Sequence, residues 1–366
     1  MVYLTNFAYF RAYHGFCPLS EERFVSLKLI APLSRLIDRG ARQFGYRFLP
    51  KSFLDLYQVD VDEPCGESGD DSPADAAAYL QRDNPRLLEL GRLYAGLDKA
   101  LKTPLVWTDE YASQTDLQHF RGHSAWVYQK GNLNLGERAH LLAAYFVLAH
   151  DELKLFEGLS EDGLFGAITY TAAGHKVSRD LLDSILEIRF LDRHLQIASR
   201  SGLKVLDIGA GYGRLADRML TAFPLLSGYF CADAIPESSF VCEYYLQFRG
   251  HQGRFKVIPA TEIDELLAAE NVELAINIHS FSECTLNAVK WWLDRLVAHR
   301  VKHFMIVPNA CNHDGRMLWN NAGEDMQPLI EQCGYRLVAR EPKYSDPGIQ
   351  KFGLNPTWFW LFGLAI

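Results

Sequence analysis

The sequence predicts an α/β protein with a mostly parallel, doubly wound sheet, preceded by a mainly helical region. Two observations support this prediction. From Lys204 onward, short apolar runs alternate five times with helical patterns, and each pair fits one strand followed by one helix. Before that point, apolar residues recur mostly at the three- and four-residue spacing of helices. The length of 366 residues leaves room for both parts, because single cores seldom grow beyond roughly 250–300 residues.

The first part of the chain, residues 1–165, is expected to form a mainly helical cap. Helical spacing is clearest in two stretches of this part, 87–101 and 137–156, and in a third just after it, 177–199. In the third stretch Ser178 is expected to cap the helix start, because its side chain can accept a hydrogen bond from a free backbone N–H. Residues 60–75 combine proline, glycine and seven acids with no base, which is typical of a mobile surface loop.

The second part, residues 166–366, is expected to hold the sheet. Its five expected strands are KVLDIG from Lys204, GYFCAD from Gly228, RFKVIPA from Arg254, VELAINIH from Val272 and KHFMIVP from Lys302. Each is followed by a helical run, as in a parallel sheet with crossover helices. Two further strand-like runs, 335–344 and 356–366, have no helical pattern between them. We expect these two to form an antiparallel hairpin at the sheet edge.

The charge and cysteine content limit the partners and the compartment. A formal net charge of −8 argues against a broad phosphate-binding surface, although the acids of residues 60–75 account for nearly all of it. The seven cysteines are irregularly spaced without a CxxC pair, which is typical of reduced thiols in a cytoplasmic protein. The longest apolar run, WFWLFGLAI, is too short to span a bilayer, so we expect no membrane partner. A homo-oligomer is left open.

A glycine-rich segment, VLDIGAGYGRLADR at 205–218, follows the first expected strand. Gly209, Gly211 and Gly213 would let the backbone turn sharply and approach a ligand at the carboxyl end of that strand. The spacing is GxGxG, and Arg214 stands where the dinucleotide fingerprint has glycine or alanine, so nicotinamide or flavin binding is disfavoured. No Gly-Lys-Ser/Thr follows, which excludes a P-loop.

Two acids at strand ends point to the charge of the ligand. Asp207 would repel a pyrophosphate but can accept hydrogen bonds from an ammonium group. Asp233 lies 24 residues after Gly209, near the roughly 20-residue offset at which an acid meets ribose hydroxyls. The D-x-G-x-G-x-G pattern resembles motif I of class I S-adenosylmethionine-dependent methyltransferases. This resemblance implies S-adenosylmethionine as the methyl donor, a ligand with an ammonium and a sulfonium.

Residues after the third and fourth strands are expected to complete the donor site. Ala260 and Thr261 would flank the adenine, with a helix cap as the alternative role for Thr261. Asn277 would face both donor and acceptor. DNA amino-methyltransferases carry a Pro-Pro-aromatic element at this place, whereas this chain has Asn-Ile-His-Ser, so nucleic acid is not expected as the acceptor.

The chemistry is expected at the end of the fourth strand. His279 is the candidate general base, because a neutral imidazole can accept a hydroxyl proton near pH 7. Glu283 would orient that ring or hold a substrate hydroxyl. The alternatives are a hydrogen-bonded wall residue for His279 and a helix start for Glu283.

A divalent cation is an alternative to the histidine base. Asn309, His313 and Asp314 follow the fifth strand and could join Glu283 in holding Mg²⁺, which would lower the pKa of a hydroxyl. Loop hydrogen bonding is the more common role for such residues, so we assign no metal ligands.

Several segments resemble a bacterial family of sugar O-methyltransferases. They are FRGHSAWVYQ (120–129), VSRDLLDS (177–184), LDIGAGYGRLA (206–216), DAIPESSFVCEYYLQFRG (233–250), NIHSFSE (277–283), VPN (307–309) and EPKY (341–344). The resemblance implies a sugar or a glycosylated metabolite as acceptor. Arg121, Trp126 and Tyr128, with Asn309, have the side chains to stack on sugar faces and bind hydroxyls, with packing as the alternative.

The expected function is therefore methyl transfer to a hydroxyl of a sugar or glycosylated metabolite. Two alternatives stay open. One is O- or N-methylation of a natural product that is not a sugar. The other is a regulator that binds an adenosyl ligand without turnover.

Overall fold

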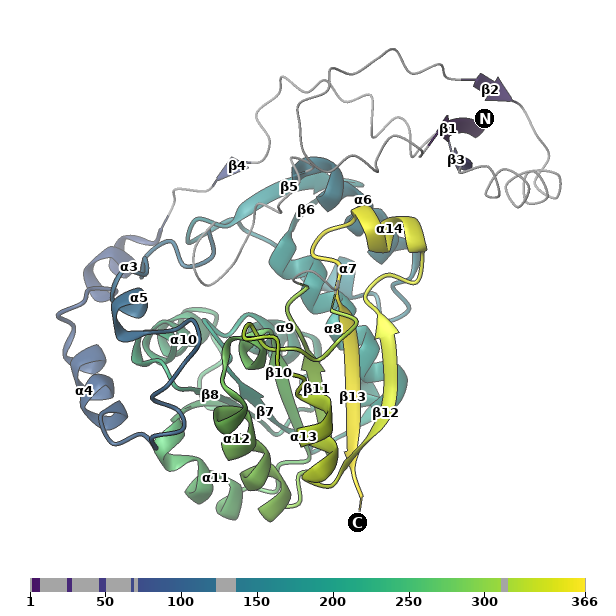
Figure 1. Ribbon diagram of the computed structural model, residues 1–366. Coiled ribbons are helices and arrows are strands. Elements are labelled where there is room, and N and C mark those ends of the chain that lie inside the picture. Colours follow the sequence, from purple (N-terminus) through teal and green to yellow (C-terminus); the bar gives the residue numbers. More distant parts are fainter. Residues whose placement is uncertain are drawn as a thin grey trace. The chain divides into compact units, whose positions relative to one another are not determined.

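The computed structural model describes residues 72–122, 136–310 and 315–365, together with four short strands nearer the N-terminus (Figure 1). The chain divides into two compact units, residues 1–64 and 65–366. The second contains the seven-stranded sheet and the candidate site. In the first unit β1 (Val2–Asn6), β2 (Val25–Leu27) and β3 (Tyr46–Pro50) form an antiparallel sheet in the order β2-β1-β3. These strands depart from the mainly helical pattern expected for residues 1–165.

A seven-stranded sheet forms the centre of the second unit, in the order β12-β13-β11-β10-β7-β8-β9. Five strands are parallel: β7 (Lys204–Ile208), β8 (Gly228–Asp233), β9 (Phe255–Pro259), β10 (Leu274–Ile278) and β11 (His303–Val307). The order 3-2-1-4-5 of these strands is that of doubly wound nucleotide-binding sheets. This confirms the predicted fold class and the five strand–helix units.

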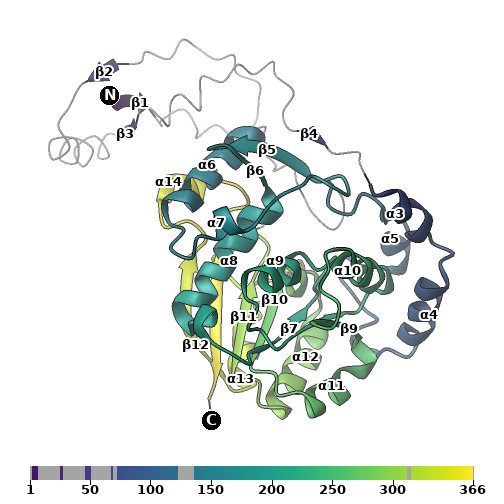
Figure 2. The same cartoon turned by 180° about the vertical axis from the view of Figure 1, so that it is seen from behind.

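Helices cover both faces of this sheet. On one face lie α8 (Arg179–Leu195), α9 (Arg214–Ala222) and α10 (Pro236–Phe248) (Figure 2). On the opposite face lie α11 (Ile263–Ala269), α12 (Leu286–Ala298) and α13 (Gln327–Gln332) (Figure 1). Covered on both faces, the central strands are mainly apolar, and Val205, Leu206 and Ile276 are fully buried.

The last two strands form the expected antiparallel pair, with one difference. β13 (Trp358–Leu364) lies between β11 and β12 (Tyr335–Pro342) and is antiparallel to both. A short helix, α14 (Pro347–Phe352), lies between the two strands, where no helix was expected. Asp346 caps it by accepting hydrogen bonds from two backbone N–H groups, and Pro347 occupies its first turn. A helix of six residues, less than two turns, is too short for apolar periodicity to reveal.

The described residues before the sheet are partly helical and partly β-strand. The helices are α3 (Ala74–Tyr79), α4 (Pro85–Tyr94), α5 (Asp109–Ser113), α6 (Gly136–Ala149) and α7 (Leu155–Gly158). Ser178 caps α8 as predicted, since its Oγ accepts a hydrogen bond from the Leu181 N–H at 3.1 Å. None of the helices in the described part of the chain is both long and apolar enough to cross a bilayer.

A β-hairpin precedes α8 and was not predicted. β5 (Ile168–Ala172) and β6 (His175–Ser178) are joined by a two-residue turn in which Ala173 and Gly174 both have positive φ. β4 (Glu67–Ser68) pairs with β5, and α3 begins at Ala74. Within the acidic segment 60–75, Glu67–Ser68 therefore form a strand and Ala74 begins a helix. Residues 60–66 and 69–71 lie outside the described residues.

Candidate functional site

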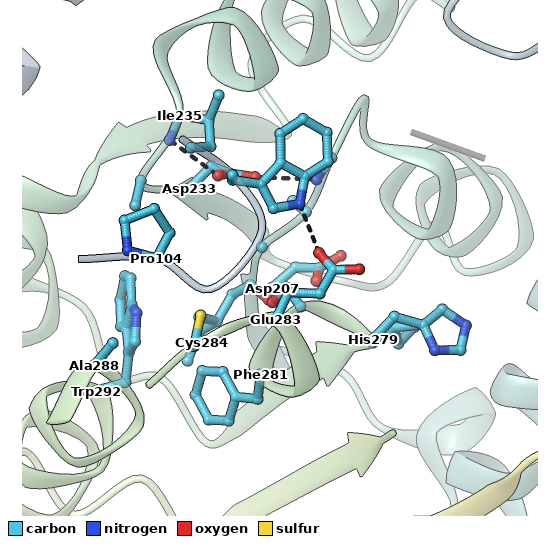
Figure 3. Close-up of a pocket in the computed structure, with 18 of the residues that line it drawn as sticks. Pro104, Asp207, Asp233, Ile235, His279, Phe281, Glu283, Cys284, Ala288 and Trp292 are labelled. Carbon is cyan, nitrogen blue, oxygen red and sulfur yellow. Dashed lines mark hydrogen bonds between the residues drawn. The ribbon is translucent and has the colours of Figure 1, made fainter. Parts of the chain in front are cut away.

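A cavity of about 210 Å³ lies at the carboxyl ends of β7, β8 and β10. Strands β7 and β10 are neighbours although they are distant in sequence, so this is the point at which the strand order reverses, where doubly wound sheets bind ligands. Figure 3 shows Pro104, Ala288 and Trp292 on one side of the cavity, His279 on the opposite side, and Asp207 and Glu283 between them. The cavity is thus apolar at one end and polar from its middle onward.

The glycine loop between β7 and α9 forms one wall of the cavity. Gly209 and Gly211 line it, and both have positive φ. A Cβ on Gly209 would lie 2.1 Å from the Ser280 Oγ, whereas a Cβ on Gly211 would meet no atom within 4 Å. Gly213 lies outside the cavity lining, and its Cβ would lie 3.0 Å from the Cys242 Sγ of α10. The first two glycines therefore shape the cavity, and the third permits close helix packing.

Asp207 is a buried carboxylate at the end of β7 with one hydrogen-bonding side chain. The Tyr229 hydroxyl donates to Asp207 at 2.9 Å, and the exposed fraction of Asp207 is 3%. Burial raises the pKa of Asp207 to about 7, because little around it compensates for a buried negative charge. A cationic group in the cavity would supply that compensation.

Asp233, at the end of β8, also lines the cavity and is held by its own loop. Its oxygens accept hydrogen bonds from the Ile235 N–H (3.1 Å), the Ser238 Oγ (2.6 Å) and the Gly211 N–H (3.4 Å). These contacts hold the carboxylate at the cavity wall, where it can accept a hydrogen bond from a ligand hydroxyl. Burial raises the pKa of Asp233 as well.

Glu283 is held over the cavity by residues from two other parts of the chain. Trp107 donates its indole N–H to one carboxylate oxygen at 2.6 Å, and Asn309 donates its amide to the other at 3.2 Å. The backbone N–H of Leu105 also binds the Glu283 carbonyl, at 3.0 Å. Burial raises the pKa of Glu283. Its carboxylate contacts Trp107 and Asn309 rather than the His279 ring.

His279 follows β10 in a strained backbone conformation. Its φ is +67°, unusual for a residue with a Cβ, and its N–H donates to the Val307 carbonyl at 2.7 Å. The ring Nε2 lies 3.3 Å from the Asn355 Nδ2, and the buried Nδ1 has no hydrogen-bond partner among the described residues. Burial, and then the positive charge of Arg179, lowers the pKa of His279 to about 3. The ring is therefore neutral at physiological pH.

Guanidinium groups line the polar end of the cavity, with carboxylates behind them. Arg179 and Arg214 line the cavity. Glu187 of α8 binds Arg214 through two hydrogen bonds of 2.8 and 2.9 Å, and Asp183 accepts from the Arg179 Nε at 3.3 Å. Neither carboxylate lines the cavity. The polar part of the cavity thus presents both carboxylates and guanidinium groups to a ligand.

Other residues expected in the site lie elsewhere. Ala260 and Thr261 begin the 3₁₀ turn after β9, and neither lines the cavity. Asn277 is fully buried and joins the ends of two strands, because its amide donates to the Ile208 carbonyl at 2.9 Å. Arg121 is fully buried in an ion pair with Glu161 at 2.7 Å, which accounts for its side chain without a substrate.

Four of the residues proposed from the sequence lie outside the described residues. They are Trp126, Tyr128, His313 and Asp314. Within the described ranges, no group of three or more histidine, cysteine or acidic side chains is arranged to hold a metal ion. Mg²⁺ therefore finds no support from the described residues.

Trp107 is the main functional candidate that sequence reasoning missed. It lies in the loop between α4 and α5, about 100 residues before the sheet, and no motif surrounds it. Its partner Glu283 is 176 positions later, so only the folded chain brings the two together.

No protein-family model matches the chain, and no curated protein matches it. The sequence comparisons thus give no support to the expected sugar O-methyltransferase family. Similar solved structures include magnesium protoporphyrin IX methyltransferase (ChlM) from Synechocystis PCC 6803 with bound SAH, with a TM-score of 0.38, 10% identity and coverage of 60% of this chain and 96% of that one.

Two further solved structures are similar. The methyltransferase domain of bacterial CtHen1 has a TM-score of 0.37 and 15% identity, over 49% of this chain and 95% of that one. The mitomycin 7-O-methyltransferase MmcR has a TM-score of 0.36 and 18% identity, over 51% of this chain and 57% of that one. These similarities are too low to assign a function to this chain.

Proposed function

We propose that this protein is an S-adenosylmethionine-dependent methyltransferase. One observation carries the proposal: Asp207 and Asp233, from adjacent strand ends, line the same cavity as Gly209 and Gly211. Two buried carboxylates in one cavity are costly unless a ligand compensates them. A ligand with a cationic group and ribose hydroxyls would compensate both, which favours an adenosyl sulfonium donor over a pyrophosphate-containing dinucleotide.

The residues present fit such a donor along the length of the cavity. Ile235, Pro104 and Trp292 provide an apolar end that suits an adenine ring. Asp233 would accept a hydrogen bond from a ribose hydroxyl, and Asp207 would bind the ammonium group. This assignment replaces Ala260 and Thr261 with Ile235 and Pro104 as the residues beside the adenine.

Glu283 is the residue best placed to accept a proton from the acceptor. S-adenosylmethionine, when bound, supplies an electrophilic methyl group. An attacking hydroxyl must lose its proton, and an acceptor is most effective when its pKa lies near the working pH. Burial moves the pKa of Glu283 upward and lowers that of His279 to about 3, so Glu283 is the stronger base of the two. We therefore assign proton acceptance to Glu283, with His279 as the second candidate.

A sugar or glycosylated metabolite is the acceptor that we propose. Trp107, Glu283 and Asn309 lie together at the cavity, and an indole beside a carboxylate and an amide suits stacking on a sugar face and binding its hydroxyls. The indole N–H and both carboxylate oxygens are already used in mutual contacts, so these side chains are held in place before any acceptor arrives.

The proposal is tested by incubating the purified protein with S-adenosyl-[methyl-³H]methionine and a panel of acceptors. The panel should contain free sugars, sugar nucleotides, glycosylated metabolites and phenolic natural products. Methylation of a sugar-containing member supports the proposal, and methylation of the phenolic compounds alone would replace the acceptor class. Tight binding of S-adenosylhomocysteine without turnover on any acceptor would favour a regulator that binds adenosyl ligands.

A further inference from the structure

A chain of polar contacts runs from α8 to the cavity through Asp183, Asn355 and His279. The Asn355 Nδ2 lies 3.3 Å from an Asp183 oxygen and 3.3 Å from the His279 Nε2. From this chain we infer that His279 is a positioning residue whose Nδ1–H donates a hydrogen bond to an oxygen of a bound ligand, and that it does not accept the proton. Its part in methyl transfer rests on the proposed function, whereas its protonation state does not.

The direction of the chain is fixed at Asp183. An ionised carboxylate only accepts hydrogen bonds, so the Asn355 atom that faces it must be the amide nitrogen. Burial opposes ionisation of Asp183, but Lys343 and Arg179 hold its pKa well below the usual range. The same amide nitrogen has a second hydrogen, which points to the His279 Nε2. The Nε2 is therefore the acceptor, and the single proton of a neutral ring lies on Nδ1.

The surroundings of the ring also disfavour its protonated form. An Nε2–H would face the amide N–H donor of Asn355. Three cations, Arg179, Arg214 and Lys343, act on the ring, and the carboxylate of Asp183 is already bound by Arg179 and Lys343. A ring held neutral, with Nε2 occupied, offers the cavity a donor and no free lone pair.

His279 lines the cavity, and its buried Nδ1 has no hydrogen-bond partner among the described residues. A buried donor without an acceptor destabilises the ligand-free protein, and a ligand oxygen would remove that cost on binding. Two ligand oxygens have this chemistry, the carboxylate of the donor and a hydroxyl or ring oxygen of the acceptor, and the kinetic arms below separate them.

The tautomer is tested directly by NMR, without any need for activity. Two-bond ¹H–¹⁵N spectra of histidine-labelled protein separate the Nδ1–H and Nε2–H tautomers, and His279→Asn identifies the His279 signals among those of the 12 histidines. We expect an Nδ1–H ring that does not titrate between pH 5 and pH 9. An Nε2–H ring, or titration near pH 6.5, would overturn the inference.

Asn355 provides a variant that tests the cause. Its φ is +45°, so Asn355→Gly removes the amide while keeping a residue suited to that backbone. Gln196→Gly, at an exposed residue with φ of +54°, is the matched control for added flexibility. We expect Asn355→Gly to shift His279 toward the Nε2–H tautomer and Gln196→Gly to leave it unchanged. An unchanged tautomer in Asn355→Gly would contradict the hydrogen bond assigned from Asn355 to His279.

Kinetics separate positioning from base catalysis. In His279→Asn the amide nitrogen can replace Nδ1 as donor, and asparagine tolerates positive φ, whereas His279→Ala lacks a donor. We expect His279→Asn to keep at least a tenth of the turnover, and His279→Ala to weaken binding about tenfold. The weakening would appear in the Kd of S-adenosylhomocysteine if the donor carboxylate is the partner, and in the KM of the acceptor if its oxygen is. A loss of turnover of about 10²–10⁴-fold in both variants, with thermal melts showing folded protein, would assign His279 as the general base instead.

Discussion

Asp207 shows how one residue can favour ligand binding at the expense of fold stability. Its carboxylate is buried, accepts one hydrogen bond from Tyr229, and has a pKa raised by burial to about 7. The folded chain therefore holds this proton up to a higher pH than the unfolded chain, in which an aspartate has a pKa of about 3.9. Stability must fall as the pH rises from about 4 to about 7, and the loss is complete above pH 7.

The first prediction concerns the stability of the ligand-free protein. Asp207→Asn keeps an acceptor for the Tyr229 hydroxyl and removes the charge, so we expect it to raise Tm at pH 8 by a few degrees. In a domain of this size about 1 kcal/mol shifts Tm by roughly 2 °C. At pH 4, where the aspartate is already protonated, the gain should vanish. Thermal melts at the two pH values check this, and an equal or lower Tm at pH 8 would contradict the burial argument.

The second prediction concerns the pH dependence of ligand affinity. An ionised Asp207 is needed to bind an ammonium group, so affinity should rise with pH up to about 7 and then level off. For a pKa of about 7, the Kd of S-adenosylhomocysteine should be about tenfold higher at pH 6 than at pH 8. Isothermal titration calorimetry measures this directly. Asp207→Asn should bind more weakly and lose this pH dependence, and a wild-type Kd independent of pH would argue against contact with Asp207.

The third prediction concerns Glu283. Glu283→Gln keeps an acceptor for the Trp107 indole but cannot take up a proton, so turnover should fall by about 10²–10⁴-fold while the Kd of S-adenosylhomocysteine stays within threefold. Burial, with Asp233 nearby, raises the pKa of Glu283, so the acid limb of the wild-type kcat profile should lie above pH 4.5. Turnover near the wild-type level in Glu283→Gln would exclude it as the proton acceptor.

At the scale of the element, the glycines of the loop have two different roles: Gly211 permits ligand approach, and Gly213 permits close helix packing. Gly211 has φ of +58° and open space at its Cβ position, which belongs to the cavity. Gly213 has φ of +88°, and its Cβ position is blocked by Cys242 and Leu246 of α10. The DxGxGxG pattern therefore combines ligand approach and helix packing, which the sequence alone does not separate.

The fourth prediction follows from this division. Gly211→Ala places a methyl group in the cavity, and we expect it to weaken S-adenosylhomocysteine binding at least tenfold at a cost of about 1 kcal/mol in stability for the positive φ. Gly213→Ala adds a clash with α10 to a similar strain, so we expect it to destabilise the protein by about 2–4 kcal/mol. Urea unfolding and calorimetry on both variants check this pair. Equal effects of the two substitutions on binding and stability would contradict the division.

At the scale of the whole molecule, local sequence patterns predicted the sheet but missed the β5–β6 hairpin and α14. The strand–helix units from Lys204 onward were predictable because the helical and strand periods are read within a few residues. The β5–β6 hairpin was missed because its turn, Ala173-Gly174, is a weak form of the two-residue signal. α14 was missed because it is less than two turns long.

The candidate site was predictable only where it lies at strand ends. Asp207 and Asp233 could be placed because carboxyl ends of neighbouring parallel strands meet at one edge of a sheet. Trp107 could not, because it comes from a loop far earlier in the chain. Arg121 shows the opposite error: a polar residue in an aromatic segment suited a sugar, but its guanidinium is fully buried against Glu161. Sequence type does not reveal which charges pair with one another.

The most direct test of the central claim, that this cavity binds the methyl donor, is a crystal structure of the protein with S-adenosylhomocysteine. We expect its ribose hydroxyls on Asp233, its ammonium group on Asp207 and its adenine beside Ile235 and Trp292. Density for the ligand at any other place, or an empty cavity at millimolar ligand, would contradict the account.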